Sequence, residues 1–171
     1  MKIAARISAP LEERPLELLY ACHEKVRRFT TLAVRLAEHV DAHGTDAEAQ
    51  EAATGILRYF EQALPLHHID EEVDVFPALR GLHDVQLERS INALSAEHLR
   101  LDTQWEAISP WLRRIAAAAA PGQTPAGLAD FAAAYAAHAE REEREVFAAI
   151  TRLPEIVVNS IGVRMRARRG A

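Results

Sequence analysis

Apolar residues recur every three or four positions along most of the chain, with polar residues between them. The first such stretch carries Leu16, Leu19, Val26, Phe29, Ala33 and Leu36. This spacing predicts a helix from about Pro15 to Ala42, with Gly44 where the helix should stop. No segment shows the convincing period-two alternation of a half-buried strand, so the pattern predicts an all-α protein.

The second helix is expected to begin at Thr45. Thr45 and Glu48 form a Thr-x-x-Glu capping box. Pro65 lies inside this helix, where it removes a hydrogen bond and clashes with the preceding turn. We therefore expect a kink or break there, after which the helix resumes through Phe76 and stops near Pro77 to Gly81.

Two further long helices are expected in the second half of the chain. The third runs from about Asp84 to Ala119, with Asp84 as N-cap and a bend at Pro110. The fourth begins at Thr124-Pro125 and extends to about Leu153. Four helices of roughly 25–35 residues with short connections predict an up-down-up-down four-helix bundle.

The last part of the chain is expected to be a short helix or tail. We interpret residues 1–171 as a single domain with its core in about 15–153 and a C-terminal extension in 154–171. Ile156 to Met165 has the pattern of a short amphipathic helix. The arginines beyond it favour a frayed, solvated tail, with a docking patch for an acidic partner as the alternative: Arg164, Arg166, Arg168 and Arg169.

Composition and charge narrow the class of protein. Hydrophobic residues make up 49% of the chain and the net charge is −5, which excludes a disordered chain and argues against a nucleic-acid partner. Cys22 is the single cysteine, so no internal disulfide forms. Residues 1–10 lack a signal-peptide pattern, and no stretch approaches the roughly 20 apolar residues of a membrane span. We expect a cytoplasmic monomer or homodimer.

One ten-residue pattern occurs twice in the chain. His67–Phe76 and His138–Phe147 both read His-x-x-x-Glu-Glu-x-x-Val-Phe. A histidine and a glutamate four residues apart lie on one face of a helix, about one turn apart. Each copy can therefore direct an imidazole and a carboxylate to one point.

The repeat extends upstream, because His23 precedes the first copy and His98 precedes the second at similar spacing. Each half of the chain thus reads as a helix with one inward histidine followed by a helix with His-x-x-x-Glu. Two such hairpins would face each other with pseudo-twofold symmetry. The predicted metal-ligand set is His23, His67, Glu71, His98, His138 and Glu142.

Four imidazoles and two carboxylates exceed the needs of one tetrahedral zinc ion. They suit two metal ions, with both glutamates bridging and an oxide or hydroxide between the ions. Mixed nitrogen and oxygen ligands favour non-haem iron, with zinc or manganese as possible substitutes. Open positions on iron would accept O₂, NO, peroxide or water.

We expect residues near the six ligands to support the site without binding metal. Phe76 and Phe147 are expected to close the site against water. Tyr20 and Tyr135 either hydrogen-bond near the metals or gate access, or are ordinary core aromatics. Candidates to accept a hydrogen bond from a ligand imidazole are Glu24, Asp70, Glu72, Asp74, Glu97 and Glu143.

The remaining histidines and the cysteine are weaker candidates. His68 either supports the site or replaces His67 if the kink at Pro65 rotates the turn. Cys22 is expected to be a small buried apolar residue, with sulfur ligation as the minor alternative. The histidines near helix ends are expected to be solvated: His39, His43 and His83.

These motifs together resemble the hemerythrin-like family, in its HHE cation-binding branch. The resemblance rests on His67-His68-x-x-Glu71-Glu72 and on His138-x-x-x-Glu142-Glu143, completed by His23-Glu24 and Glu97-His98, and spans about 16–153. It implies a four-helix bundle with a non-haem di-iron centre held by the six residues named above. Oxygen-carrying members have one more histidine, and iron–sulfur-cluster repair members usually carry an additional N-terminal domain with a cysteine pair, which this chain lacks.

We therefore expect a metal-binding protein that binds, senses or buffers O₂, NO or iron, rather than an enzyme. The alternative is a stress-response protein with NO or peroxide chemistry, or one that donates iron for cluster repair. A third interpretation is a structural bundle that holds adventitious metal.

Overall fold

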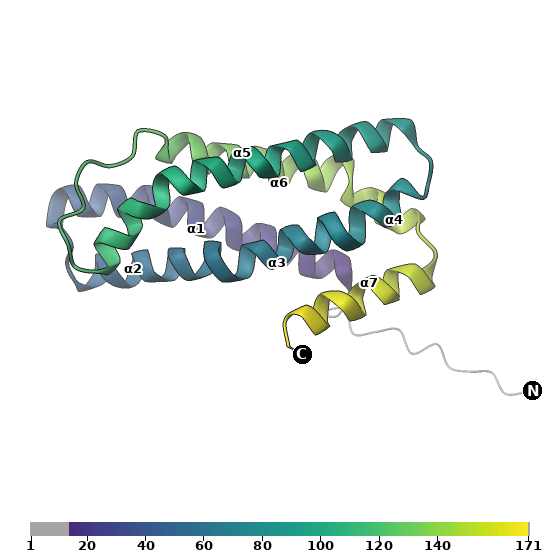
Figure 1. Ribbon diagram of the computed structural model, residues 1–171, viewed down its shortest axis with the longest axis horizontal. Coiled ribbons are helices and arrows are strands. Elements are labelled where there is room, and N and C mark those ends of the chain that lie inside the picture. Colours follow the sequence, from purple (N-terminus) through teal and green to yellow (C-terminus); the bar gives the residue numbers. More distant parts are fainter. Residues whose placement is uncertain (1–13, 171) are drawn as a thin grey trace, which may run out of the picture.

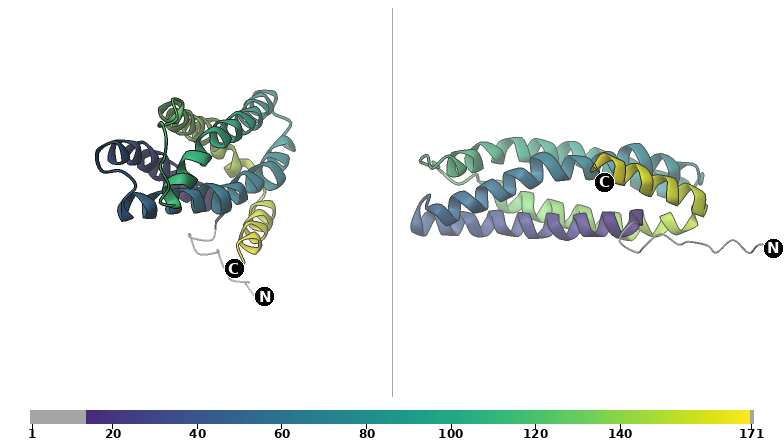
Figure 2. Two further views of the ribbon diagram at one scale, coloured as in Figure 1. Left: turned by 60° about the vertical axis from the view of Figure 1, so that its left-hand side comes forward. Right: turned by 90° about the horizontal axis from the view of Figure 1, so that it is seen from below.

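The computed structural model describes residues 14–170, which form four long antiparallel helical rods with a further helix packed outside them (Figure 1). The rods are α1 (Pro15–His43), a second rod from α2 (Ala47–Arg58) to α4 (Phe76–Arg80), α5 (Val85–Ala116), and α6 (Leu128–Glu145). α1 and α5 each contact both α2 and α6, and Figure 2 shows the rods running side by side. No strand occurs between residues 14 and 170. The predicted all-α, up-down-up-down bundle is confirmed.

The second rod passes through two prolines without breaking. It contains two π-helical turns, η2 (Tyr59–Ala63) and η3 (Asp70–Val75), and α3 (Leu64–Ile69) lies between them. Each π turn ends directly before a proline-containing turn, at Pro65 and Pro77. A wider turn accommodates the missing N–H and the bulk of the proline ring. Of the kink or break predicted at Pro65, the break is wrong, because the rod continues there through a locally widened turn.

Short polar side chains begin the second and third rods. The Asp46 carboxylate accepts a hydrogen bond from the Ala49 amide at 2.9 Å, so Asp46 and not Thr45 is the N-cap. The Asp84 carboxylate accepts from the amides of Gln86 and Leu87, which confirms the predicted cap of α5. Gly44 ends α1 with a φ of 75°, a left-handed conformation that favours glycine.

The fourth rod is shorter than its sequence predicts. α6 begins at Leu128, three residues after Pro125, and its regular turns end at Glu145. The 3₁₀ segment η4 (Phe147–Arg152) continues the rod. Apolar residues remain in register through Ile150, and their spacing does not distinguish a 3₁₀ turn from an α turn. The predicted helix from Thr124-Pro125 to Leu153 is thus wrong at both ends.

The C-terminal extension forms α7 (Glu155–Arg168), which lies along the bundle beside the second rod (Figure 1). Arg164 and Arg168 form ion pairs with Asp74, and Arg168 and Arg169 with Asp70. Both carboxylates belong to η3 and are buried. The predicted solvated arginine tail is wrong, because the arginines are engaged by acids of the bundle.

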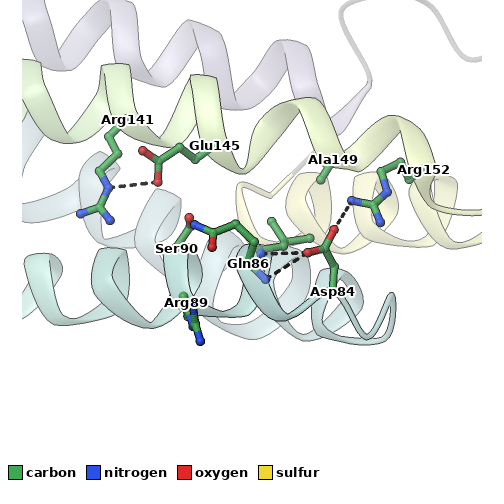
Figure 3. Close-up of a pocket in the computed structure, with 9 residues that line it drawn as sticks. Asp84, Gln86, Arg89, Ser90, Arg141, Glu145, Ala149 and Arg152 are labelled. Atoms are coloured by element: carbon green, nitrogen blue, oxygen red, sulfur yellow. Dashed lines mark hydrogen bonds and ion pairs between the residues drawn. The ribbon is translucent and has the colours of Figure 1, made fainter.

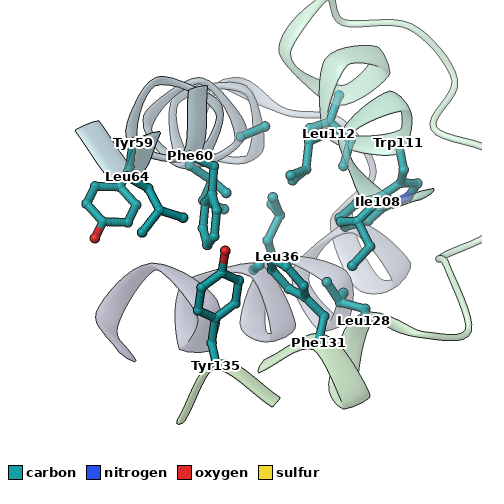
Figure 4. Close-up of a cluster of buried hydrophobic side chains, with 14 of the residues drawn as sticks. Leu36, Tyr59, Phe60, Leu64, Ile108, Trp111, Leu112, Leu128, Phe131 and Tyr135 are labelled. Atoms are coloured by element: carbon teal, nitrogen blue, oxygen red, sulfur yellow. The ribbon is translucent and has the colours of Figure 1, made fainter. Parts of the chain in front are cut away.

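The apolar core consists of two clusters, one toward each end of the bundle. One lies between α1, α2, α5 and α6 and includes Ile56, Phe60, Leu112, Phe131 and Tyr135 (Figure 4). The other lies near the opposite end and joins the bundle to α7; it includes Leu19, Phe76, Leu94, Phe147 and Met165. Buried polar residues lie between the two clusters.

No helix in the described part of the chain is long and apolar enough to cross a membrane. Residues 1–10, where no signal-peptide pattern is expected, lie outside the described part. The assignment of residues 1–171 to a single domain stays a prediction.

Candidate metal centre

The fold brings all six predicted ligand residues together between the two apolar clusters. His23 comes from α1, His67 and Glu71 from the second rod, His98 from α5, and the last two from α6. None is more than 5% exposed: His23, His67, Glu71, His98, His138 and Glu142. A buried carboxylate or imidazole is costly without a partner, so a cluster of six requires a compensating interaction.

Glu71 lies between imidazoles from both halves of the chain. Its Oε1 lies 3.1 Å from His67 Nε2 and 4.0 Å from His23 Nε2. Its Oε2 lies 3.5 Å from His98 Nε2. One oxygen thus faces the two histidines of the first half, and the other faces His98 of the second half.

Glu142 occupies the equivalent place from the opposite rod. Its Oε2 lies 3.2 Å from His23 Nε2 and 3.6 Å from His138 Nε2. Like Glu71, this carboxylate contacts histidines from both halves of the chain. Two carboxylates placed in this way are suited to bridge two adjacent cations.

Most atoms that face the centre lack hydrogen-bond partners among residues 14–170. They comprise Nε2 of three histidines and all four oxygens of the two glutamates: His23, His98, His138, Glu71 and Glu142. Buried polar atoms are almost always paired, so seven unpaired atoms at one point require an explanation. They are imidazole nitrogens and carboxylate oxygens, the atoms that iron, zinc and manganese bind. The residues present therefore fit a metal centre.

The ligand atoms form two groups that share Glu142. One group joins His23, His67, Glu71 and Glu142, and the other joins His98, His138 and Glu142, with ligand atoms within 4.8 Å of one another in each. Glu71 also approaches the second group through His98. Each of the two groups contains two imidazoles.

Three of the four histidines are oriented by a carboxylate on their other ring nitrogen. The Nδ1 of His23 lies 2.8 Å from Glu143, that of His98 lies 2.9 Å from Glu72, and that of His138 lies 3.0 Å from Glu97. When Nδ1–H donates to a carboxylate, Nε2 is free to bind a metal and its basicity increases. Three of the six candidate acceptors are thereby identified.

The two adjacent glutamates of each motif contact the two different ring nitrogens of one histidine. Glu142 faces Nε2 of His23, while the adjacent Glu143 meets Nδ1 of the same ring. In the other half, Glu71 faces Nε2 of His98 and Glu72 meets its Nδ1. Two of the other candidates, Asp70 and Asp74, instead form ion pairs with arginines of α7.

Two arginines of the site were missed by sequence reasoning. Arg27 donates to Glu143 at 2.8 Å and Arg141 donates to Glu97 at 2.7 Å. Each lies three or four residues after a site histidine, on the same helix face, and that spacing was the available signal. They hold the carboxylates that orient the imidazoles.

Arg141 also borders a surface cavity of about 500 Å³, shown in Figure 3. Its guanidinium donates to Glu145 at 3.1 Å, and Arg152 across the cavity donates to Asp84 at 2.7 Å. These charges of the cavity wall compensate one another. None of the six ligand residues lines this cavity. Its link to the metal centre is Arg141, which donates to Glu97, the carboxylate that contacts His138.

The aromatic residues at the end of the site behave largely as expected. Phe147 stacks on the His23 ring with centroids 5.0 Å apart, and Phe76 lies parallel to the His98 ring at 6.2 Å. Both are fully buried, as befits a seal against water. Tyr20 is 39% exposed and packs edge-on against Phe147, which fits an aromatic at the edge of the core rather than a gate.

His68 and Tyr135 lie beside the centre without joining it. The His68 ring stacks on the His98 ring at a centroid distance of 4.2 Å, while His67 faces Glu71. His68 and Tyr135 line a surface cavity of about 270 Å³ together with Trp105 and Asp102. Figure 4 shows the Tyr135 hydroxyl directed toward Phe60.

Burial controls the protonation of the ligand groups. Desolvation, reinforced by the nearby Glu142 charge, raises the pKa of Glu71 well above its usual value of 4.5. Desolvation lowers the pKa of His67 well below 6.5 and also lowers that of His138. These shifts favour the neutral form of the His67 and His138 imidazoles, which is the form that binds a cation, and they favour the protonated form of Glu71, whose proton a cation must displace.

Cys22 is half-buried beside His23 and is not directed at the centre. Its Sγ lies 3.2 Å from the Tyr59 hydroxyl, which donates to the Cys22 carbonyl at 3.0 Å. Burial raises the pKa of the thiol to about 11. The expectation of a small, largely buried residue agrees with this environment.

Fold and site together define a helical-bundle protein with a buried histidine–glutamate centre suited to cations. The Hemerythrin HHE cation binding domain matches residues 14–150. The chain belongs to this family.

A relative from Haemophilus influenzae, described as an uncharacterized protein, is 40% identical over 101 residues. The match covers 59% of this chain and 58% of the relative. The similarity therefore spans little more than half of either protein.

Proposed function

We propose that this protein holds two non-haem iron ions through His23, His67, Glu71, His98, His138 and Glu142, and that it binds or buffers a small diatomic molecule, O₂ or NO. The observation that carries the proposal is the set of seven buried ligand atoms without hydrogen-bond partners. Removing a cation from such a set leaves two carboxylates and three imidazole nitrogens desolvated and unpaired.

Iron is favoured over zinc by the number and kind of ligands. Six protein residues with two carboxylates between two histidine pairs exceed a tetrahedral site and suit higher coordination. Iron ions in such a site would supply redox activity and open positions for O₂ or NO. Zinc or manganese would occupy the same ligands without altering the fold.

The protein supplies orientation, exclusion of water and an approach route. Glu72, Glu97 and Glu143 orient three imidazoles, and Phe76 and Phe147 seal one end of the centre. The surface cavity of about 270 Å³ is lined by His68, whose ring stacks on that of His98, so this cavity lies beside the centre. A diatomic molecule is small enough to enter this cavity.

The decisive experiment measures metal content per chain after expression with ample iron, together with the visible spectrum before and after exposure to O₂ or NO. We expect two irons per chain and a reversible spectral change with one of the gases. One zinc per chain, or no metal, would sink the di-iron proposal. Two irons without a response to either gas would retain the centre and reject gas binding as its purpose.

A further inference from the structure

The two halves of the chain differ in whether the residue before the first histidine is an acid. The residue before the first histidine is Glu97 in the second half, preceding His98, and Cys22 in the first half, preceding His23. The other charged residues in contact with the imidazoles follow the symmetry, because Glu72 matches Glu143 and Glu71 matches Glu142.

In the second half, this position supports a ligand imidazole. The Glu97 carboxylate lies 3.0 Å from Nδ1 of His138, and Arg141 holds that carboxylate at 2.7 Å. The pair sets both the orientation and the basicity of the His138 ring.

In the first half, the corresponding support is missing. The Nδ1 of His67 is buried and has no hydrogen-bond partner in the described part of the chain. Cys22 carries a neutral thiol that is engaged by Tyr59. Asp70, which corresponds to Arg141, directs its carboxylate to Arg168 and Arg169 rather than to the imidazole.

The two cation positions therefore have unequal ligands. At the position of His98 and His138, both imidazoles are backed by carboxylates, Glu72 and Glu97. At the position of His23 and His67, only His23 is backed, by Glu143. Loss of one such partner weakens metal binding by about 10–100-fold.

We propose that the cation position formed by His98 and His138 retains its ion tightly, and that the position formed by His23 and His67 is the labile one. Cys22, standing where a glutamate would complete the symmetry, sets this difference. The inference rests on the proposed two-metal function. It makes the labile ion the one that a chelator or an acceptor protein removes first.

The test uses the full chain loaded with two Fe²⁺ ions without oxygen and mixed with excess ferrous chelator. We expect two release phases of equal amplitude, with rates separated by about 10–100-fold. Glu97→Gln should accelerate the slow phase by about tenfold and leave the fast phase unchanged. Glu24→Gln is the matched control, because Glu24 is an exposed acid beside His23, and it should change neither phase.

A second variant tests the same inference in the opposite direction. Cys22→Glu should slow the fast phase by supplying the missing acceptor for His67. Where this variant fails to fold, the Glu97→Gln result decides by itself, since glutamine preserves volume. The ⁵⁷Fe Mössbauer spectrum of half-depleted wild-type protein should show one iron environment, and half-depleted Glu97→Gln should show two.

The opposing outcomes separate this inference from the proposed function. Wild-type protein that binds fewer than two ions overturns both. Two ions that leave in a single phase overturn the inequality alone. Equal acceleration of both phases by Glu97→Gln also overturns it, because a general loss of structure would act on both positions.

Discussion

Arg168, near the end of the chain, donates to the carboxylate of Asp70, which directly precedes the site residue Glu71. The same guanidinium reaches Asp74 at 2.6 Å. Both carboxylates are buried, and burial raises the pKa of Asp70 while the arginine charges oppose that shift. α7 therefore neutralises two acids on the rod that carries His67 and Glu71.

We predict that Arg168→Ala lowers the free energy of unfolding by about 3 kcal/mol, because it leaves buried carboxylates without a principal partner. Urea denaturation monitored by circular dichroism measures this. Arg144→Ala is the control, since Arg144 is 60% exposed and its ion pairs lie at the surface. Its loss should cost less than about 1 kcal/mol. Equal effects of the two substitutions would contradict a specific role for α7.

Adjacent histidines should differ sharply in their effect on metal content. We predict that His67→Gln lowers the iron content below two per chain, since its Nε2 faces Glu71. His68→Gln should leave the content at two, because its ring stacks on His98 and belongs to neither ligand group. Elemental analysis of the purified proteins gives both values. Loss of metal in His68→Gln alone would reverse the assignment.

Metal binding should strengthen as pH rises. In the metal-free protein the raised pKa of Glu71 keeps its proton bound to higher pH, whereas the lowered pKa values of His67 and His138 leave those rings neutral. A cation therefore displaces a proton chiefly from Glu71. For each proton released, the metal affinity should rise by up to about tenfold per pH unit. Glu71→Gln should flatten this slope as well as weaken binding. Metal titrations at several pH values, with proton release followed by an indicator, test the sign.

The same pKa shifts predict opposite effects on the stability of the metal-free protein. Glu71 binds its proton more tightly in the folded state than in the unfolded state. Its contribution to the free energy of unfolding is therefore complete below pH 4.5, its usual pKa, and is lost as the pH rises through its raised pKa in the folded state. His67 binds its proton less tightly in the folded state, so its contribution to the free energy of unfolding is lost as the pH falls below 6.5, its usual pKa. Glu71→Gln should therefore raise the melting temperature of metal-free protein most at alkaline pH. A variant effect that is greatest near pH 4 would contradict the raised pKa.

Removal of metal should lower the melting temperature of the wild-type protein. A ligand at a hundred times its dissociation constant stabilises the folded state by about 2.7 kcal/mol. Replacing both bridging acids by glutamine, at Glu71 and Glu142, should abolish this metal-dependent shift. Glu140→Gln, which removes a 76%-exposed carboxylate on the same helix, should preserve it. Calorimetry with and without Fe²⁺ measures this shift in melting temperature for the double variant and for Glu140→Gln.

Sequence periodicity predicted the four rods well because each buries a long apolar stripe. It failed where the helix type changes, as at Pro65 and after Glu145, since π, 3₁₀ and α turns bury nearly the same residues. It also chose Thr45 over Asp46, because adjacent short polar residues are both competent caps and only the chain path selects one.

The orienting carboxylates illustrate the limit for the site. Six acids near the motifs were equal candidates, and three contact the ligand histidines. Each contact joins residues far apart in the chain, as for Glu143 and His23. Helical spacing reports which residues share a face of one helix, but it carries no information about the partner across the bundle.

The sequence by itself determined the helical class, the repeated His-x-x-x-Glu motif and the six residues that converge. These follow from short-range geometry, because residues four apart on a helix are neighbours in any fold. Tertiary structure alone decided which acid meets which imidazole, that α7 neutralises Asp70 and Asp74, and that His67 lacks the support His138 receives. Those relationships depend on the relative placement of whole helices, which many weak packing contacts set together and no local pattern encodes.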